Sequence, residues 1–259
     1  MAEAGRVLDA HFVELTKAFG YGEFSDGAGN KLHYRLYTPK LEAGQRYPLV
    51  IFLHGSGERG SDNELQVAGN RGAVIWSEPE EQAERPCYVL APQAEADGSF
   101  TIPSFEAAFI AFLKQFLAEN PVDAGRVYLT GLSMGGTGSW YYLCKYPAFW
   151  AAAAPIASTG DPTVLYNAKD IPMWTFHGVD DPFAPIEWRV DAPGVLSCGS
   201  RILGNLLRKM GGNVCSTEYP AGYIHERWGY PKEVAGHAAW EPAYSSAEFR
   251  RWLFRQRKP

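Results

Sequence analysis

Cysteine is scarce in this sequence, and its placement does not match a metal-binding pattern. Only four of the 259 residues are cysteine, and no two of them form a CxxC pair or another zinc-like spacing. No metal site is therefore predicted. We expect free, partly buried thiols at Cys87, Cys144, Cys198 and Cys215. The one disulfide to test is Cys198–Cys215, because these residues flank a predicted helix; such a bridge is typical of an oxidising compartment.

Long apolar runs and clusters of basic residues are also missing. No run approaches the ~20 residues that a bilayer-spanning helix needs, so no membrane span is predicted. The net charge is −5 and the only Lys/Arg-rich stretch is the short tail 255–258, which argues against a nucleic-acid partner. The first residues, MAEAGRVLDAHF, do not form a signal peptide, so we expect a cytoplasmic protein, or a secreted one if a signal has been removed. Nothing in the composition indicates an oligomeric state.

What the sequence does contain is a regular alternation of strand and helix patterns. Residues 11–18 and 31–38 predict an antiparallel hairpin at the N-terminal edge, around the turn-rich stretch SDGAGN. Continuous apolar runs predict buried strands at 49–55, 87–93, 127–133, 151–158, 173–178 and 214–220. Helical spacing of apolar residues predicts helices at 103–120, 134–145, 200–210 and 245–256. Together they predict an α/β fold, a mostly parallel, doubly wound sheet of about eight strands with helices on both faces, as a single domain over 1–259.

The pentapeptide GLSMG (131–135) stands between a predicted strand and a predicted helix. A serine on such a sharp turn is held in strained φ/ψ angles and projects above the sheet. Side chains two positions before and two after it would collide with neighbouring backbone, which explains glycine at both places. We therefore predict that Ser133 is a catalytic nucleophile.

A serine nucleophile needs donors that stabilise the oxyanion of the tetrahedral intermediate. The first is the N–H of the residue after the nucleophile, Met134, and the second comes from the loop after an earlier strand. The glycine-rich loop HGSG (54–57) has that position, and we predict the Ser56 N–H, with Gly57 as the alternative. His54 is expected to be structural. Glu58 and Arg59 are expected to form an ion pair that braces the loop, with a substrate role as the alternative.

The serine also needs a base, and the base needs a carboxylate that orients it. In proteins that carry the nucleophilic serine on such a strand–helix turn, the acid follows the serine in the chain and the histidine follows the acid. Asp181 lies just past the strand that ends at 176 and precedes a proline that stiffens the loop; its neighbour Asp180 is the alternative. His177 precedes the acid and is therefore interpreted as structural.

His237 is the predicted base. It lies in the loop VAGHAAWEPAY (234–244), after the final strand and before the last helix, and Gly236 permits a bent loop there. His225, in GYIHERW, is closer to the end of the strand and is the alternative.

Several segments together resemble the α/β-hydrolase superfamily. They are LHGSGERGSDN (53–63), PCYVLAPQ (86–93), GLSMGG (131–136), HGVDDPFAP (177–185) and GHAAWEPAY (236–244). More narrowly, the chain is similar to capless esterases of the phospholipase/carboxylesterase or dienelactone-hydrolase-like groups, and close in pattern to polyhydroxybutyrate-depolymerase-like and feruloyl-esterase-like proteins. The resemblance covers residues 30–256 and implies Asp181 as the acid and His237 as the base. Two departures are Ser133, where dienelactone hydrolases proper carry cysteine, and Ala184, where a branched residue is commoner.

These residues predict a serine carboxylesterase that works through an acyl-enzyme and needs no cofactor. The alternatives are an oligopeptidase-like serine peptidase, for which we find no gating domain, and a binding protein with a dead site. About fifteen residues separate the strands 151–158 and 173–178, too few for a large cap domain. An open site suits short-chain, aryl or carbohydrate-linked esters. The long irregular stretches 56–86 and 179–199 follow strand ends, and four aromatic residues near predicted loops are candidates either for substrate lining or for core packing: Trp76, Phe183, Trp188 and Trp240.

Overall fold

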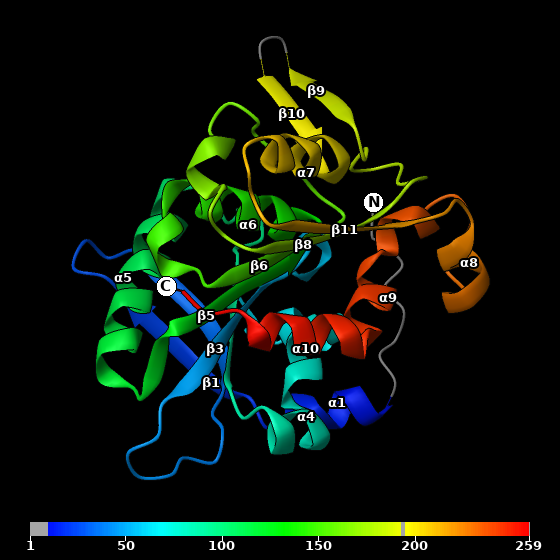
Figure 1. The fold of residues 1–259 in the computed structure, drawn as a ribbon. Coiled ribbons are helices and arrows are strands. Elements are labelled where there is room, and N and C mark those ends of the chain that lie inside the picture. Colours follow the sequence, from blue (N-terminus) through cyan, green and yellow to red (C-terminus); the bar gives the residue numbers. More distant parts are fainter. Residues whose placement is uncertain (1–9, 193–194, 259) are drawn as a thin grey trace.

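The computed structural model describes residues 10–192 and 195–258, and its centre is an eight-stranded sheet. The strand order is β1-β2-β4-β3-β5-β6-β8-β11. The β1–β2 and β2–β4 pairs are antiparallel and the other neighbours are parallel, which confirms the mostly parallel sheet (Figure 1). The strands are β1 (Gly20–Ser25), β2 (Lys31–Tyr37), β3 (Tyr47–Leu53), β4 (Tyr88–Gln93), β5 (Val122–Leu132), β6 (Ala152–Ile156), β8 (Met173–Gly178) and β11 (Val214–Tyr219).

Helices cover both faces of this sheet and bury one apolar cluster on each. One face carries α5 (Pro103–Glu119), α6 (Met134–Lys145) and α7 (Ser200–Lys209). The other carries α1 (Ala10–Thr16), α3 (Arg71–Val74), α8 (Tyr223–Trp228), α9 (Trp240–Ser245) and α10 (Ala247–Arg255). The remaining helices are α2 (Leu65–Ala68) and α4 (Pro79–Glu84).

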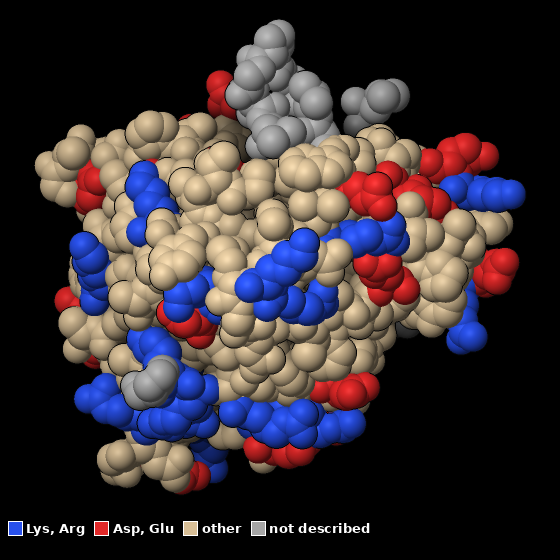
Figure 2. Space-filling model, turned by 45° about the horizontal axis from the view of Figure 1, so that its top comes forward, with Lys and Arg blue, Asp and Glu red and all other residues tan. Residues whose placement is uncertain are grey.

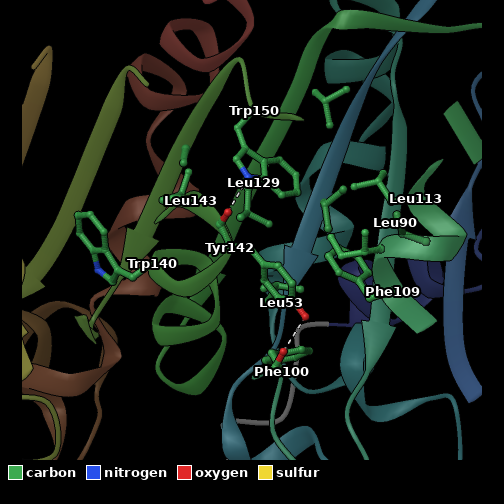
Figure 3. Close-up of a cluster of buried hydrophobic side chains, with 14 of the residues drawn as sticks. Leu53, Leu90, Phe100, Phe109, Leu113, Leu129, Trp140, Tyr142, Leu143 and Trp150 are labelled. Carbon is green, nitrogen blue, oxygen red and sulfur yellow. Dashed lines mark hydrogen bonds between the residues drawn. The ribbon is translucent and has the colours of Figure 1, made fainter. Parts of the chain in front are cut away.

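Strand β3 shows why a continuous apolar run forms a central strand. Its side chains alternate between the two faces, so Leu49 and Ile51 enter the cluster under α5 and α6, while Val50 and Phe52 enter the opposite cluster. Figure 3 shows the first of these clusters. Tyr142 on α6 satisfies its buried hydroxyl by donating to a backbone carbonyl at 2.6 Å. A strand buried on both sides therefore holds the loop that follows it in a fixed place.

The predicted strand at 11–18 is wrong, because this segment forms helix α1 and the strand begins at residue 20. The predicted turn is present, with the Asp26 carboxylate accepting from the N–H groups of Ala28 and Asn30 at 2.9 Å. The buried guanidinium of Arg35 on β2 donates to the carbonyl of Thr16 at 2.9 Å, and so satisfies the last turn of α1. That contact joins distant segments, and the local pattern does not reveal it.

The stretch 179–199, expected to be irregular, contains two antiparallel strands. They are β9 (Trp188–Ala192) and β10 (Val195–Gly199), and β10 also pairs with the short strand β7 (Thr159–Gly160). This small second sheet lies at the top of Figure 1, apart from the helices α9 and α10. The four cysteines are free, as expected, and the one disulfide to test is not formed, because Cys198 and Cys215 belong to different sheets.

Charged side chains are distributed without strong segregation over the surface in view. Figure 2 shows acidic and basic residues interspersed among larger uncharged areas. Within residues 10–192 and 195–258, no helix is long and apolar enough to cross a bilayer. In the same described part, no group of three or more His, Cys, Asp and Glu side chains could hold a metal ion.

Candidate active site

Ser133 lies on a strained turn between β5 and α6. Its φ of 51° and ψ of −118° fall in a region that non-glycine residues rarely adopt. A Cβ atom at Gly131 would approach the carbonyl oxygen of Gly135 to 2.5 Å, and one at Gly135 would approach that of Leu53 to 2.0 Å. Both distances are far below contact, so the spacing of glycines around the serine is a steric requirement, as the sequence indicated.

The structure brings together the three side chains predicted as nucleophile, base and acid. His237 Nε2 lies 2.8 Å from Ser133 Oγ, and His237 Nδ1 lies 2.8 Å from Asp181 Oδ2. A carboxylate accepts hydrogen bonds, so the proton of a neutral imidazole lies on Nδ1. Nε2 is then an acceptor that faces the Ser133 hydroxyl.

Asp181 is buried and fully engaged. Its Oδ1 accepts from the backbone N–H groups of Phe183 and Ala184, both at 2.9 Å. Its Oδ2 accepts from His237 and also lies 3.3 Å from His177 Nε2. Burial by itself raises the pKa of a carboxyl group, but the hydrogen bonds from His177 and His237 outweigh it and hold the pKa of Asp181 well below its usual range. Asp181 is therefore an anion at neutral pH.

The alternatives to the acid and the base lie elsewhere. Asp180 is exposed and accepts from the backbone N–H of Gly222 at 2.9 Å. His225 belongs to α8, where its Nδ1 donates to the carbonyl of Tyr230 at 2.7 Å. Neither side chain belongs to the chain of hydrogen bonds that ends at Ser133.

Two glycines let the acid loop and the base loop approach each other. His237 belongs to a short 3-10 helix, η5 (Ala235–Ala238). A Cβ at Gly178 would lie 2.2 Å from the carbonyl oxygen of Gly236, and one at Gly236 would lie 2.5 Å from backbone atoms of Asp180. The close backbone contact fixes the position of His237 relative to the end of β8.

Two further histidines near the site are buried and structural, as expected. His177 Nε2 donates to the carbonyl of Ala184 at 2.7 Å, and its Nδ1 faces the Ser200 hydroxyl at 2.9 Å, so it braces the acid loop. His54 Nε2 accepts from the N–H of Ala94 at 3.0 Å. Burial lowers the pKa of His54 to about 4, so its ring is neutral at pH 7.

A pocket of about 500 Å³ opens above Ser133. Both predicted oxyanion donors line it. Ser56 begins the short 3-10 helix η1 (Ser56–Glu58) and Met134 begins α6, so neither N–H has an acceptor within its own helix. The alternative, Gly57, is not among the described residues that line the pocket, which are Ser56, Arg59, Ser133, Met134, Thr137, Ala157, Thr159, Phe183, Ala184 and His237.

The family described as esterase PHB depolymerase matches residues 32–192, which is more than half of the sequence. The chain belongs to this esterase family. A solved thermostable esterase is 39% identical, with a TM-score of 0.84 over 95% of this chain and 64% of that one. The putative esterase NocK of Nocardia uniformis subsp. tsuyamanensis is 26% identical over 186 residues, 64% of this chain and 50% of the relative.

The fold of this family member is the α/β-hydrolase fold expected from the sequence. A ferulic acid esterase structure shares it, with a TM-score of 0.62 at 17% identity over 91% of this chain and 98% of that chain. Such low identity shows the fold alone. The chain spans half the length of NocK and 64% of the thermostable esterase, so it corresponds to only part of these two relatives.

Of the four candidate aromatic residues, only Phe183 is among the described residues that line the pocket. Its side chain is 44% exposed, and its ring lies 5.2 Å from that of His237. Trp188 is exposed outside the lining, and Trp240 packs edge-on against the His237 ring with only 8% exposed. The prediction that Trp76 lines the pocket is wrong. It is buried in the cluster under α9 and α10, and its indole N–H donates to the carbonyl of Gly72 at 2.8 Å.

Sequence reasoning missed four residues that line this pocket. Thr137 could have been found, because a residue four positions after the serine lies on the same side of α6. Ala157, with a φ of 48°, and Thr159 follow β6, and nothing in the local pattern marks them. Ala184, noted only as a departure from the family pattern, also lines the pocket. Arg59 was not missed in the same way, because a substrate role was its alternative. It lines the pocket, and its Nε donates to the sulfur of Met134 at 3.1 Å, which differs from the expected ion pair.

Proposed function

We propose that this chain is a serine carboxylesterase in which Ser133, His237 and Asp181 are the nucleophile, the base and the acid. The observation that carries the proposal is the continuous chain of hydrogen bonds, with both links 2.8 Å long. Membership of an esterase family supports it independently. The orientation of His237 is the one that general-base catalysis requires, because its unprotonated Nε2 faces the serine hydroxyl.

In the proposed mechanism Ser133 Oγ attacks the ester carbonyl carbon while His237 Nε2 takes the hydroxyl proton. The carbonyl oxygen becomes an oxyanion, which accepts hydrogen bonds from the Ser56 and Met134 N–H groups. The tetrahedral intermediate then collapses, the C–O bond to the alcohol breaks, and His237 gives its proton to the leaving oxygen. Water repeats the sequence on the acyl-enzyme, which releases the acid and regenerates the serine.

Asp181 supports both steps through its charge. Because it remains ionised at neutral pH, it stabilises the imidazolium that forms each time His237 takes a proton. Its hydrogen bonds from two backbone N–H groups and from His237 hold the carboxylate in one orientation. The orientation of the Asp181 carboxylate is therefore fixed before the substrate binds, which reduces the reorganisation needed in the transition state.

The proposed substrates are short-chain, aryl or carbohydrate-linked carboxylic esters. The pocket lining includes an exposed aromatic ring, Phe183, beside His237. A leaving alcohol must lie within reach of His237 Nε2 to be protonated, so it lies beside Phe183. No cofactor enters this mechanism.

The test compares wild type with Ser133→Ala on p-nitrophenyl acetate, p-nitrophenyl butyrate and a peptide p-nitroanilide. We expect the rate of ester hydrolysis to be at least ~10⁴-fold lower in the variant than in wild type. A fluorophosphonate should add to intact wild type, as seen by protein mass, but not to Ser133→Ala. Undiminished ester turnover in the variant refutes the nucleophile assignment, and activity on the anilide alone makes the enzyme a peptidase.

A further inference from the structure

A second cavity, of about 810 Å³, adjoins the pocket above Ser133. Thr137 and Thr159 line both, so the two cavities share a boundary, and together we call them the cleft. Each of the two volumes by itself is in the range of small-molecule sites. The described residues that line the second cavity are Thr101, Thr137, Trp140, Tyr141, Cys144, Lys145, Thr159, Gly160, Asp161, Thr163, Val164, Asn167 and Ser197.

Helix α6 forms one wall of this second cavity. Thr137, Trp140, Tyr141 and Cys144 recur three, four and seven positions apart, so they lie along one side of the helix. At 1.5 Å per residue this wall is about 10 Å long. In Figure 3 Trp140 lies at one flank of the apolar cluster, apart from the other labelled side chains. A Cβ at Gly160 would meet Trp140 at 2.8 Å, so glycine allows β7 to close against the helix.

The cavity lies on the side of the serine that is opposite to His237. Trp140 and Cys144 belong to the apolar cluster under α5 and α6, whereas Trp240 and the residues that flank His237 belong to the cluster on the other face of the sheet. The carbon attacked by Ser133 carries three other groups. The oxyanion points to the Ser56 and Met134 N–H groups, and the leaving oxygen points to His237. The acyl chain takes the remaining direction, past Thr137 and Thr159.

The polar groups along this path are mostly uncharged. The Thr159 hydroxyl faces the cavity and has no partner among the described residues, and the same holds for the exposed side-chain amide of Asn167. The charges are already engaged: the Lys145 ammonium pairs with Glu106 at 2.6 Å, and the Asp161 carboxylate accepts from its own loop. The available groups are therefore neutral donors and acceptors.

We infer that the cavity along α6 is the acyl subsite, and that it takes an elongated, uncharged acyl group that carries hydrogen-bonding oxygen atoms. This inference rests on the proposed esterase function and deepens it, because it divides the cleft into a leaving-alcohol side at Phe183 and an acyl side at Thr159. The Thr159 hydroxyl is accessible from the cavity, and an ether, hydroxyl or carbonyl oxygen of the acyl chain would accept a hydrogen bond from it.

The experiment uses two p-nitrophenyl esters with acyl chains of matched length, octanoate and 6-methoxyhexanoate, and p-nitrophenyl acetate as the short reference. For wild type we expect kcat/KM for the methoxy ester to exceed that for octanoate about fivefold, the effect of one hydrogen bond. Thr159→Val keeps the shape of the side chain and removes its hydroxyl. It should abolish this preference and so bring the ratio of the two long esters to about one.

The second variant blocks the cavity from its rim. Val164 lines the cavity with 43% of its surface exposed, so Val164→Trp can fill the space without disturbing the core. We expect the ratio of kcat/KM for the long esters to that for acetate to fall about tenfold. The matched control is Tyr166→Trp, at a position that is 64% exposed and outside the lining, and its ratios should equal those of wild type.

Three outcomes overturn the inference: an unchanged long-to-acetate ratio in Val164→Trp, an oxygen preference that survives Thr159→Val, or a loss confined to acetates of long alcohols such as octyl acetate. The last result would place the alcohol along α6. None of them touches the proposed function, which fails separately if acetate hydrolysis does not depend on Ser133.

Discussion

Replacing Asp181 by asparagine is the sharpest test of the proposed hydrogen-bond chain. In the folded protein one carboxylate oxygen accepts from two backbone N–H groups, and the other accepts from His237 and lies 3.3 Å from His177 Nε2. An amide group presents one acceptor and one donor. If its NH₂ faces His237, two donors oppose each other and the imidazole must move its proton to Nε2. The base then offers Ser133 an N–H instead of a lone pair.

The size of the expected loss follows from the geometry. At 2.8 Å between Nδ1 and Oδ2, an imidazolium–carboxylate pair contributes about 6 kcal/mol for an effective dielectric constant of ~20. Since about 1.4 kcal/mol corresponds to a factor of ten in rate, removing the charge should lower kcat by ~10⁴-fold. The opposite orientation of the amide does not rescue activity, because its NH₂ would face the N–H groups of Phe183 and Ala184.

The assay is the initial rate of p-nitrophenyl acetate hydrolysis, with circular dichroism to establish that the variant is folded. Asp180→Asn is the matched control, because this neighbouring carboxylate is exposed and contacts Gly222 instead of His237. It should stay within about threefold of wild type. The reasoning is refuted if folded Asp181→Asn keeps more than a tenth of the wild-type kcat, or if Asp180→Asn loses as much.

Three other predictions concern stability and packing. The pKa of Asp181 is depressed in the folded state, so its contribution to the free energy of unfolding is present above the usual carboxyl pKa of 3.8 and is lost as the pH falls through the folded value. The difference in melting temperature between wild type and Asp181→Asn should therefore shrink from pH 7 to pH 3. A constant difference would contradict this. Gly135→Ala places a Cβ 2.0 Å from a β3 carbonyl oxygen and should cost roughly 3 kcal/mol in urea unfolding, whereas Gly27→Ala, with open space around it, should cost little. Trp76→Ala should destabilise the protein by roughly 3–5 kcal/mol. Phe183→Ala, at a 44% exposed residue, should raise KM for aryl esters and leave the unfolding midpoint nearly unchanged. The reverse pattern would indicate that Trp76, and not Phe183, lines the pocket.

The sheet and the residues around Ser133 could be predicted because their constraints are local. A strand such as β3, buried on both faces, requires an unbroken apolar run, and a serine on a tight strand–helix turn requires glycine on either side. The choice of Asp181 over Asp180 also followed from its place before a proline. In each case neighbouring residues in the chain determine the geometry, so the pattern is visible without the fold.

Other features were decided only when distant segments packed together. Residues 10–16 form a helix whose last carbonyl, that of Thr16, accepts from Arg35, and Trp76 enters the core because α9 and α10 cover it. The cleft along α6 exists because β7, β10 and the segment after β6 close against that helix. The sequence by itself indicated which serine, acid and base to expect, since the glycines around Ser133 and the order of the three residues along the chain are visible without the fold. Which side chains surround the substrate depends on tertiary contacts, because burial is a property of the assembled layers and not of any single segment.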